Sequence, residues 1–102
     1  MSHVMHPAIA ESATLVVAPD VLSSELGSEH VLLNLTDGTY YGLDEVGGEI
    51  WKRLQAPTTI AEICRALVDL FDVEPMRCRQ DVETLLADLL AHGLIQIQGA
   101  AT

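Results

Sequence analysis

Four histidines and two cysteines are the side chains in this sequence best suited to binding a transition metal. No pair of them combines the spacing of a zinc motif with a matching second pair of ligands. Cys64 and Cys78 lie instead on apolar stripes of expected helices, where a free cysteine packs as a small hydrophobic residue. We therefore expect no metal centre and no cofactor. The histidines in question are His3, His6, His30 and His92.

Nucleophilic catalysis is the second chemistry that these residues could support. Arg77 and Arg79 flank Cys78 and would favour its thiolate if the side chain were exposed, but its place on an apolar stripe argues against exposure. The sequence contains no G-x-S-x-G, P-loop or G-x-G-x-x-G motif. Close helix packing explains Gly47-Gly48 better than phosphate binding does. No catalytic constellation can be assembled, so the sequence predicts a protein that is not an enzyme.

The charge of the chain narrows the classes of partner. Fifteen Asp and Glu residues stand against five Lys and Arg residues in 102 positions, for a formal net charge of −10. Affinity for DNA comes largely from basic residues that neutralise phosphates, and an anionic lipid surface repels acidic proteins in the same way. We therefore expect no nucleic-acid or membrane partner, and a protein or peptide partner that is neutral or basic.

Hydropathy, the N-terminal segment and the cysteine count together predict a cytoplasmic protein. No apolar run approaches the ~18–20 residues that a membrane-spanning helix needs. Met1–Glu11 lacks the basic and apolar regions of a secretory signal. Two cysteines do not make a disulfide framework, which fits a reducing compartment.

The elements that must position any site begin with β-structure between Thr14 and Leu43. A short β-branched run covers residues 14–17, and alternating segments cover residues 21–26, 30–35 and 39–43. Val31, Leu33 and Leu35 share one face by the period of two residues. Asp37-Gly38 is a hairpin signal, so the last three segments are expected to form a three-stranded antiparallel sheet.

Three helices are expected after this sheet. Asp44 can cap the first helix, Thr59 and Glu62 form a capping box for the second, and Pro75 suits the first turn of the third. Gly93 stands where a helix-terminating residue with positive φ belongs. The apolar stripes are Val46, Ile50, Trp51 and Leu54; Ile60, Ile63, Cys64, Leu67, Val68 and Phe71; and Cys78, Val82, Leu85, Leu86, Leu89 and Leu90.

These elements predict a small α+β domain of the winged helix-turn-helix type. A short final strand is possible over residues 94–98. The domain is expected to span residues 14–98, preceded by a flexible tail over 1–13 and followed by a frayed end over 99–102.

The segment Thr39–Leu43 ends the expected sheet, so we expect one side of it to be an open edge that can pair with an extended peptide. Tyr41 and Leu43 are expected to face the core, whereas Tyr40 points the other way and is the better candidate for a ligand contact. The acidic residues Asp81, Glu83 and Asp88 form either a solvated helix face or a rim that selects a basic or neutral peptide.

Several motifs together resemble the PqqD-like family over about residues 20–97. They are the D-G turn, the Y-x-L-[DN]-E-x-G motif from Tyr41 to Gly47, Ile50-Trp51, the T-[IV]-x-E-I box at Thr59, the D-V-x-P link before the third helix, and the D-V-x-x-L-L…GLI ending. The resemblance implies a winged helix that binds the leader of a ribosomally made, post-translationally modified peptide. Such a domain presents the rest of that precursor to a separate enzyme, such as a radical SAM protein, a cyclase or a leader peptidase. Members of the family occur in pyrroloquinoline quinone and lasso-peptide pathways.

The resemblance also implies where the leader would bind. The leader would add as a strand beside Thr39, Tyr40, Tyr41, Gly42 and Leu43, and would lie against the third helix at Asp81, Leu85 and Asp88. We expect an adaptor that works by bringing the precursor close to its enzyme. A DNA-binding regulator and a purely structural subunit of a maturation enzyme remain alternatives. The sequence leaves open whether the protein is a monomer or a homodimer.

Overall fold

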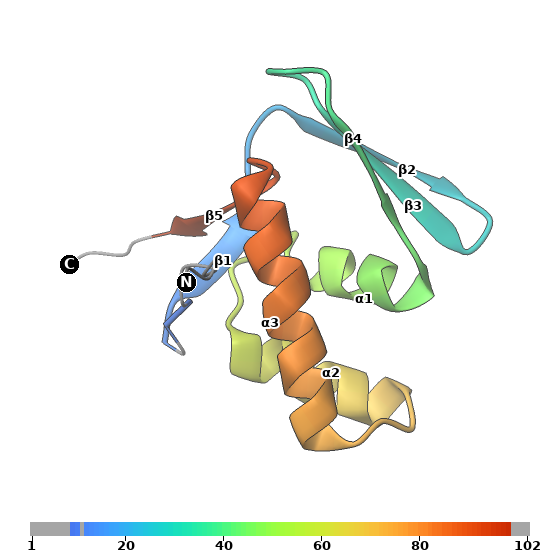
Figure 1. Cartoon of the computed structure of the whole chain (residues 1–102), viewed down its shortest axis with the longest axis vertical. Coiled ribbons are helices and arrows are strands. Elements are labelled where there is room, and N and C mark those ends of the chain that lie inside the picture. The colour runs from blue at the N-terminus through green and yellow to red at the C-terminus, as the bar shows by residue number, and fades with distance from the viewer. Residues whose placement is uncertain (1–8, 11, 99–102) are drawn as a thin grey trace, which may run out of the picture.

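Two small antiparallel sheets and three helices make up the computed structural model, which describes residues 9–10 and 12–98 (Figure 1). The expected end over residues 99–102, most of the expected tail over 1–13, and with it His3 and His6, lie outside the described residues. The elements are β1 (Thr14–Val17), β2 (Val21–Leu26), β3 (Glu29–Asn34), β4 (Tyr40–Leu43), α1 (Glu45–Arg53), α2 (Ile60–Leu70), α3 (Pro75–Ala91) and β5 (Ile95–Gln98).

The predicted three-stranded sheet is confirmed, with the antiparallel order β2-β3-β4. Gly27 turns the chain between β2 and β3 with a φ of +68°. The hairpin predicted at Asp37-Gly38 connects β3 to β4 through residues 35–39, where Gly38 has a φ of +76°. There the Asp37 carboxylate accepts a hydrogen bond of 3.0 Å from the Thr39 amide, as in an Asx turn.

The inner face of this sheet, which we define as the face toward α1 and the core, differs from a simple apolar pattern. In β3 the buried residues are His30, Leu32 and Asn34, whereas Val31 and Leu33 lie half-buried on the opposite, outer face. The Asn34 side chain is satisfied there, because its Nδ2 donates to the His92 carbonyl oxygen at 3.0 Å. The face that Val31 and Leu33 share is therefore not the core face.

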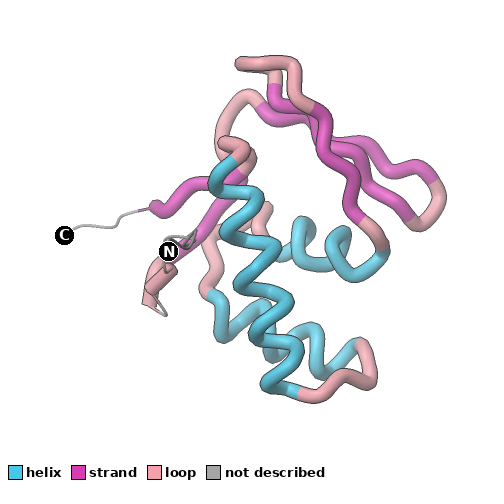
Figure 2. The backbone as a smooth tube through the Cα atoms, viewed as in Figure 1, coloured by secondary structure: helices cyan, strands magenta, loops and turns pink. Residues whose placement is uncertain are grey.

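The second sheet joins the two ends of the domain. β1 pairs with β5 in an antiparallel register that sets Leu15 opposite Ile97. The Leu15 amide also donates to the Thr58 carbonyl oxygen at 2.7 Å, and the Thr58 amide donates back to Leu15 at 3.0 Å. This sheet lies beside the helices, away from the β2–β4 sheet (Figure 2).

The helix boundaries follow the capping residues. Asp44 accepts a hydrogen bond from the Gly47 amide at 2.8 Å, and Thr59 forms the predicted capping box with Glu62. Pro75 is the first residue of α3, and Glu74 caps this helix by accepting from an amide of its first turn. None of the described helices is both long enough and apolar enough to cross a membrane.

The end of α3 is a Schellman motif. Gly93 has a φ of +73°, its amide donates to the Leu90 carbonyl oxygen at 3.0 Å, and the Leu94 amide donates to Leu89 at 2.9 Å. This turn directs the chain out of α3 and straight into β5.

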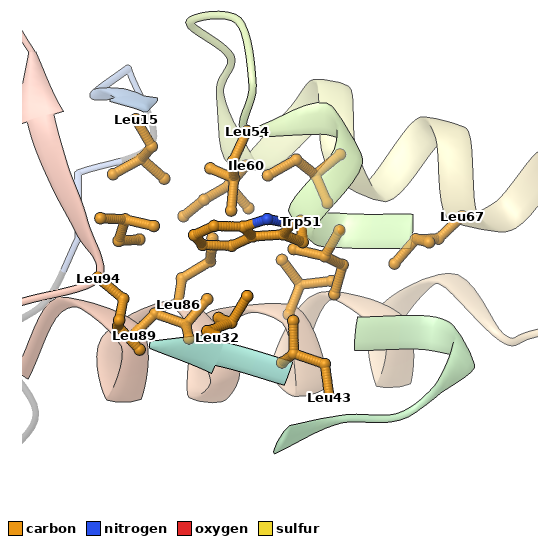
Figure 3. Close-up of a cluster of buried hydrophobic side chains, with 14 of the residues drawn as sticks. Leu15, Leu32, Leu43, Trp51, Leu54, Ile60, Leu67, Leu86, Leu89 and Leu94 are labelled. Atoms are coloured by element: carbon orange, nitrogen blue, oxygen red, sulfur yellow. The ribbon is translucent and has the colours of Figure 1, made fainter. Parts of the chain in front are cut away.

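Trp51 lies at the centre of the core, surrounded by leucine and isoleucine side chains from both sheets and all three helices (Figure 3). Two residues of the expected apolar stripes, Val46 and Val68, are exposed instead. Both lie at an edge of their stripe and face grooves on the surface. The fully buried side chains of the core include Leu15, Leu32, Leu54, Ile60, Ile63, Leu67, Val82, Leu86, Leu89 and Leu94.

Candidate functional site

The outer edge of β4 pairs with no other strand among the described residues. At the start of this strand the Asn34 amide donates to the Thr39 carbonyl oxygen at 2.9 Å. Bonded and non-bonded pairs alternate along an antiparallel ladder, so Tyr41 also bonds to β3. The N–H and C=O groups of Tyr40 and Gly42 therefore point away from β3, toward the open edge.

A groove of about 570 Å³ runs beside this edge, between β4 and the helices. Its walls are mostly apolar, with Asp44 and Asp81 as the charged side chains among them. This volume lies within the range of pockets that take small ligands or side chains. The lining residues are Tyr41, Gly42, Leu43, Asp44, Val46, Gly47, Ile50, Leu67, Phe71, Val73, Cys78, Asp81, Val82 and Leu85.

The structure brings together most of the site residues that the sequence suggested. Five of the eight line the groove, namely Tyr41, Gly42, Leu43, Asp81 and Leu85. The other three, Thr39, Tyr40 and Asp88, are not among its lining residues. Tyr40 belongs to the open edge through its backbone, while its side chain is 70% exposed on the outer face of the sheet.

Asp88 ties β4 to α3 at one end of the groove. The Tyr41 hydroxyl donates a hydrogen bond to the Asp88 carboxylate, and the His92 ring stands edge-on to Tyr41 with the ring centroids 5.4 Å apart. Burial, followed by this hydrogen bond to Asp88, raises the pKa of Tyr41 to about 12. The neutral Tyr41 hydroxyl thus acts as a hydrogen-bond donor, and its contact with Asp88 links the strand to the helix.

The opposite wall of the groove comes from α1, which approaches the sheet closely. A Cβ atom at Gly48 would lie 2.5 Å from Nδ1 of His30, and one at Gly47 would lie 3.1 Å from a methyl group of Leu43. This confirms the prediction that close helix packing explains Gly47-Gly48. The two glycines let α1 sit against the strands and narrow the groove.

Sequence reasoning missed the groove wall that α1 and α2 contribute. Val46, Ile50, Leu67, Phe71 and Val73 line the groove, although their spacing indicates only helix stripes and a link. The exposed Val46, next to the glycine pair that follows the cap of α1, is the signal that could have pointed to this wall.

The cysteines show no sign of a reactive thiol. Cys78 is buried, and burial raises the pKa of the half-buried Cys64 thiol to about 11. Within residues 9–10 and 12–98, no group of three or more His, Cys, Asp or Glu side chains is placed to hold a metal ion.

Most of the basic side chains lie beside acidic side chains on α1 and α3. Four of them pair with acidic residues on their own helix, which reduces the positive charge available to phosphates. The pairs are Lys52–Glu49 at 3.2 Å, Arg53–Glu49 at 3.8 Å, Arg77–Asp81 at 3.8 Å and Arg79–Glu83 at 3.0 Å. This arrangement does not favour DNA binding.

Comparison with known proteins gave one family and several solved structures. Residues 29–95 match the family model of coenzyme PQQ synthesis protein D (PqqD). The structure of TbiB1 in complex with the TbiA(beta) leader peptide is similar, with a TM-score of 0.73 and 32% sequence identity over 85% of this chain and 99% of that one. A search of curated proteins gave no match.

Two further structures share the fold at lower identity. A lasso peptide synthetase B1 complexed with the leader peptide has a TM-score of 0.72 and 23% identity, over 85% of this chain and 99% of that chain. The PqqD truncation of Methylobacterium extorquens PqqCD has a TM-score of 0.73 and 21% identity, over 90% of this chain and 99% of that chain. That truncation represents a functional, stand-alone recognition element for ribosomally synthesized and post-translationally modified peptides.

Proposed function

We propose, from the finding that the chain belongs to the PqqD family, that it binds the leader of a ribosomally made precursor peptide by strand addition. The bound precursor is then presented to a modifying or processing enzyme. The observation that carries the proposal is an open strand edge that lies directly beside an apolar groove. The 32% identical TbiB1 was solved with a leader peptide bound, which supports the same class of ligand here.

The backbone of β4 supplies affinity in this proposal. Tyr40 and Gly42 offer two outward N–H groups and two outward C=O groups to an extended peptide, and Thr39 and Leu43 flank them. Main-chain hydrogen bonds of this kind hold many sequences equally well. They therefore fix the position of the leader and leave selectivity to the groove.

The groove supplies selectivity. Alternate side chains of an added strand point to the inner face, where Tyr41, Leu43 and Leu85 line the apolar walls. Bulky apolar leader residues gain from burial in this groove, at about 25 cal/mol per Å² of apolar surface. Asp44 and Asp81 disfavour acidic leader residues beside it. Asp88 acts through Tyr41 by holding β4 and α3 together.

The function that follows is that of an adaptor without a catalytic step of its own. A leader held on β4 keeps the rest of the precursor tethered, and tethering raises its effective concentration at the active site of a bound enzyme. The enzyme supplies the chemistry, and the adaptor determines which peptide reaches it.

The experiment compares the two edges of the same sheet. In the Gly42→Pro variant, β4 loses an outward N–H group that its ladder with β3 does not use. In the matched Ser23→Pro variant, β2 loses an outward N–H group at the opposite edge, since Ser23 occupies the equivalent non-bonded position. Binding of a synthetic precursor leader is measured by calorimetry, with the TbiA(beta) leader of the 32% identical TbiB1 as the first probe.

We expect Gly42→Pro to weaken leader binding by about tenfold or more, whereas Ser23→Pro should leave binding unchanged. A tenfold loss corresponds to the free energy of one lost hydrogen bond together with local strain in the complex. Circular dichroism checks that both variants stay folded. Equal affinity in all three proteins would contradict strand addition at β4. If the enzyme processed leaderless precursor equally well, the protein would instead be a structural subunit.

A further inference from the structure

The outer face of the β2–β4 sheet carries a continuous apolar surface. Cross-strand pairing sets Leu22 opposite Leu33 and Leu33 opposite Tyr40, so the three side chains form one row across the sheet. Val31 lies in the next row, and Leu26 lies beyond it at the end of β2. We call this surface, formed by Leu22, Leu26, Val31, Leu33 and Tyr40, the outer apolar face.

The alternation of β2 and β3 departs from that of a sheet with one solvated side. Such a sheet normally places apolar residues inside and polar residues outside. Here the inner positions include Ser23 and Glu25 in β2 and His30 in β3, whereas the outer positions include Leu22 and Leu26. Leu32 of β3 and Val21 of β2 still pack on the core side, so these two strands carry apolar residues on both faces.

No described helix covers this face. The three helices lie on the other side of the sheet in Figure 1, and α1 packs against β3 and β4 from within. Leu22 is 56% exposed and Leu26 is 61% exposed. Contiguous exposed apolar surfaces on small proteins mark interaction sites, whereas single exposed apolar residues need no explanation. The outer apolar face is therefore a candidate interaction surface.

We propose that the outer apolar face docks the maturation enzyme that acts on the precursor, an inference that rests on the proposed function. Tyr40 belongs to both surfaces, because its backbone faces the open edge of β4 and its side chain lies on the outer face. A leader strand added at that edge would extend the outer face by one strand. An enzyme seated there touches adaptor and bound leader together, and so favours the loaded adaptor over the empty one.

Charge identifies the kind of surface that fits. The segment 20–44, which contains the whole sheet, has no Lys or Arg residue. Its acidic residues are Asp20, Glu25, Glu29, Asp37 and Asp44, and Glu29 lies on the outer face itself, opposite Leu26. A second copy of this chain would bring the same acids and a formal net charge of −10 against them. The complementary partner surface is apolar at its centre, with a basic or uncharged rim.

The test separates leader binding from enzyme docking. The Leu22→Ser/Leu26→Ser double variant removes apolar side chains from the outer face, and the matched Val68→Ser/Met76→Ser variant removes exposed apolar side chains from α2 and α3. Each is measured for affinity toward the synthetic leader. Each is then measured for the adaptor concentration that gives half-maximal processing of the precursor by the purified maturation enzyme of the same pathway.

We expect the outer-face variant to bind the leader as the wild type does, and to need about tenfold or more adaptor for half-maximal processing. The α2–α3 variant should match the wild type in both assays. In a second pair, Ser24→Arg should impair processing more than Ser24→Glu does, because Ser24 lies within the outer face and an added positive charge there repels a partner whose rim is basic.

Unchanged processing by the outer-face variant would overturn this inference while leaving leader binding intact. Loss of leader affinity in that variant would also overturn it, since the face would then belong to the leader site. A wild-type dimer that the variant converts to a monomer in sedimentation velocity would assign the face to a second copy. If the wild type itself fails to bind the leader, the proposed function fails first, in a separate assay.

Discussion

Replacing Gly48 by alanine tests the close contact that positions α1 against the sheet. The new methyl group would lie 2.5 Å from Nδ1 and 2.8 Å from Cε1 of His30, well inside van der Waals contact. The His30 ring is buried, and its Nε2 lies 3.3 Å from the Glu25 carboxylate. The ring is rigid and enclosed, so relief requires the helix or the strand to move.

The magnitude follows from two opposing terms. Overpacking of a buried site costs about 1–3 kcal/mol, and a separation of 2.5 Å belongs in the upper part of that range. Alanine in place of glycine stabilises a helix interior by up to about 1 kcal/mol. We therefore expect Gly48→Ala to lower the free energy of unfolding by about 1–2 kcal/mol. For a domain of this size that corresponds to a fall in Tm of about 5–15 °C.

The assay is urea denaturation of four proteins in a double-mutant cycle with His30→Ala. With the ring removed, the alanine methyl group at position 48 meets open space, and only the helix-propensity gain remains. Gly48→Ala should then be neutral or stabilising, so the sign of its effect changes between the two backgrounds. Equal destabilisation in both backgrounds would refute the steric explanation of the glycine pair.

Three further substitutions probe the groove and its frame. Tyr41→Phe should lower the free energy of unfolding by about 1–2 kcal/mol at neutral pH through loss of the bond to Asp88. The pKa of Tyr41 is raised in the folded state, so the stability that Tyr41 contributes is present below about pH 10 and is lost as the pH rises toward 12. Urea titrations across this range should therefore show that the free energy of unfolding falls more steeply for the wild type than for the variant. Gly93→Ala should cost about 1–2 kcal/mol in the same assay, because its φ of +73° strains any residue with a Cβ. Leu85→Ser, at a half-buried groove position, should weaken leader binding about 5- to 30-fold in calorimetry with little change in Tm.

Local chemistry made much of the fold predictable from the sequence. Asp44, Thr59, Pro75 and Gly93 each have a side chain or a backbone freedom that suits one place at a helix end, and each occupies that place. The alternation of the strands likewise located the sheet, with β3 shifted by one residue at each end. These signals act over a few residues, so a single sequence reveals them.

Features set by distant contacts could not be predicted in the same way. The pairing of β1 with β5 joins the two ends of the domain, and the residues of each short strand do not indicate which other strand it pairs with. The inner face of β3 contains His30 and Asn34, because tertiary contacts with Gly48 and His92 accommodate their polar groups there. Periodicity alone assigns such positions to solvent.

The candidate site likewise has a part that the sequence predicts and a part that depends on distant contacts. The strand Thr39–Leu43 and the helix position Leu85 follow from the order of elements and the family motifs. The wall built by α1 and α2 depends on how closely the helices approach the sheet, which only the structure reveals. The role of Asp88 also depends on that approach, because its partner Tyr41 lies in a different element.

Amide hydrogen exchange by NMR, with and without the leader, tests strand addition most directly. The amides of Tyr40 and Gly42 point outward in the free protein and should exchange quickly, whereas the amide of Tyr41 belongs to the ladder with β3 and should be protected throughout. Saturation with the leader should slow exchange at Tyr40 and Gly42 alone among these three. Unchanged exchange at both outward amides in a saturated complex would contradict leader binding on β4.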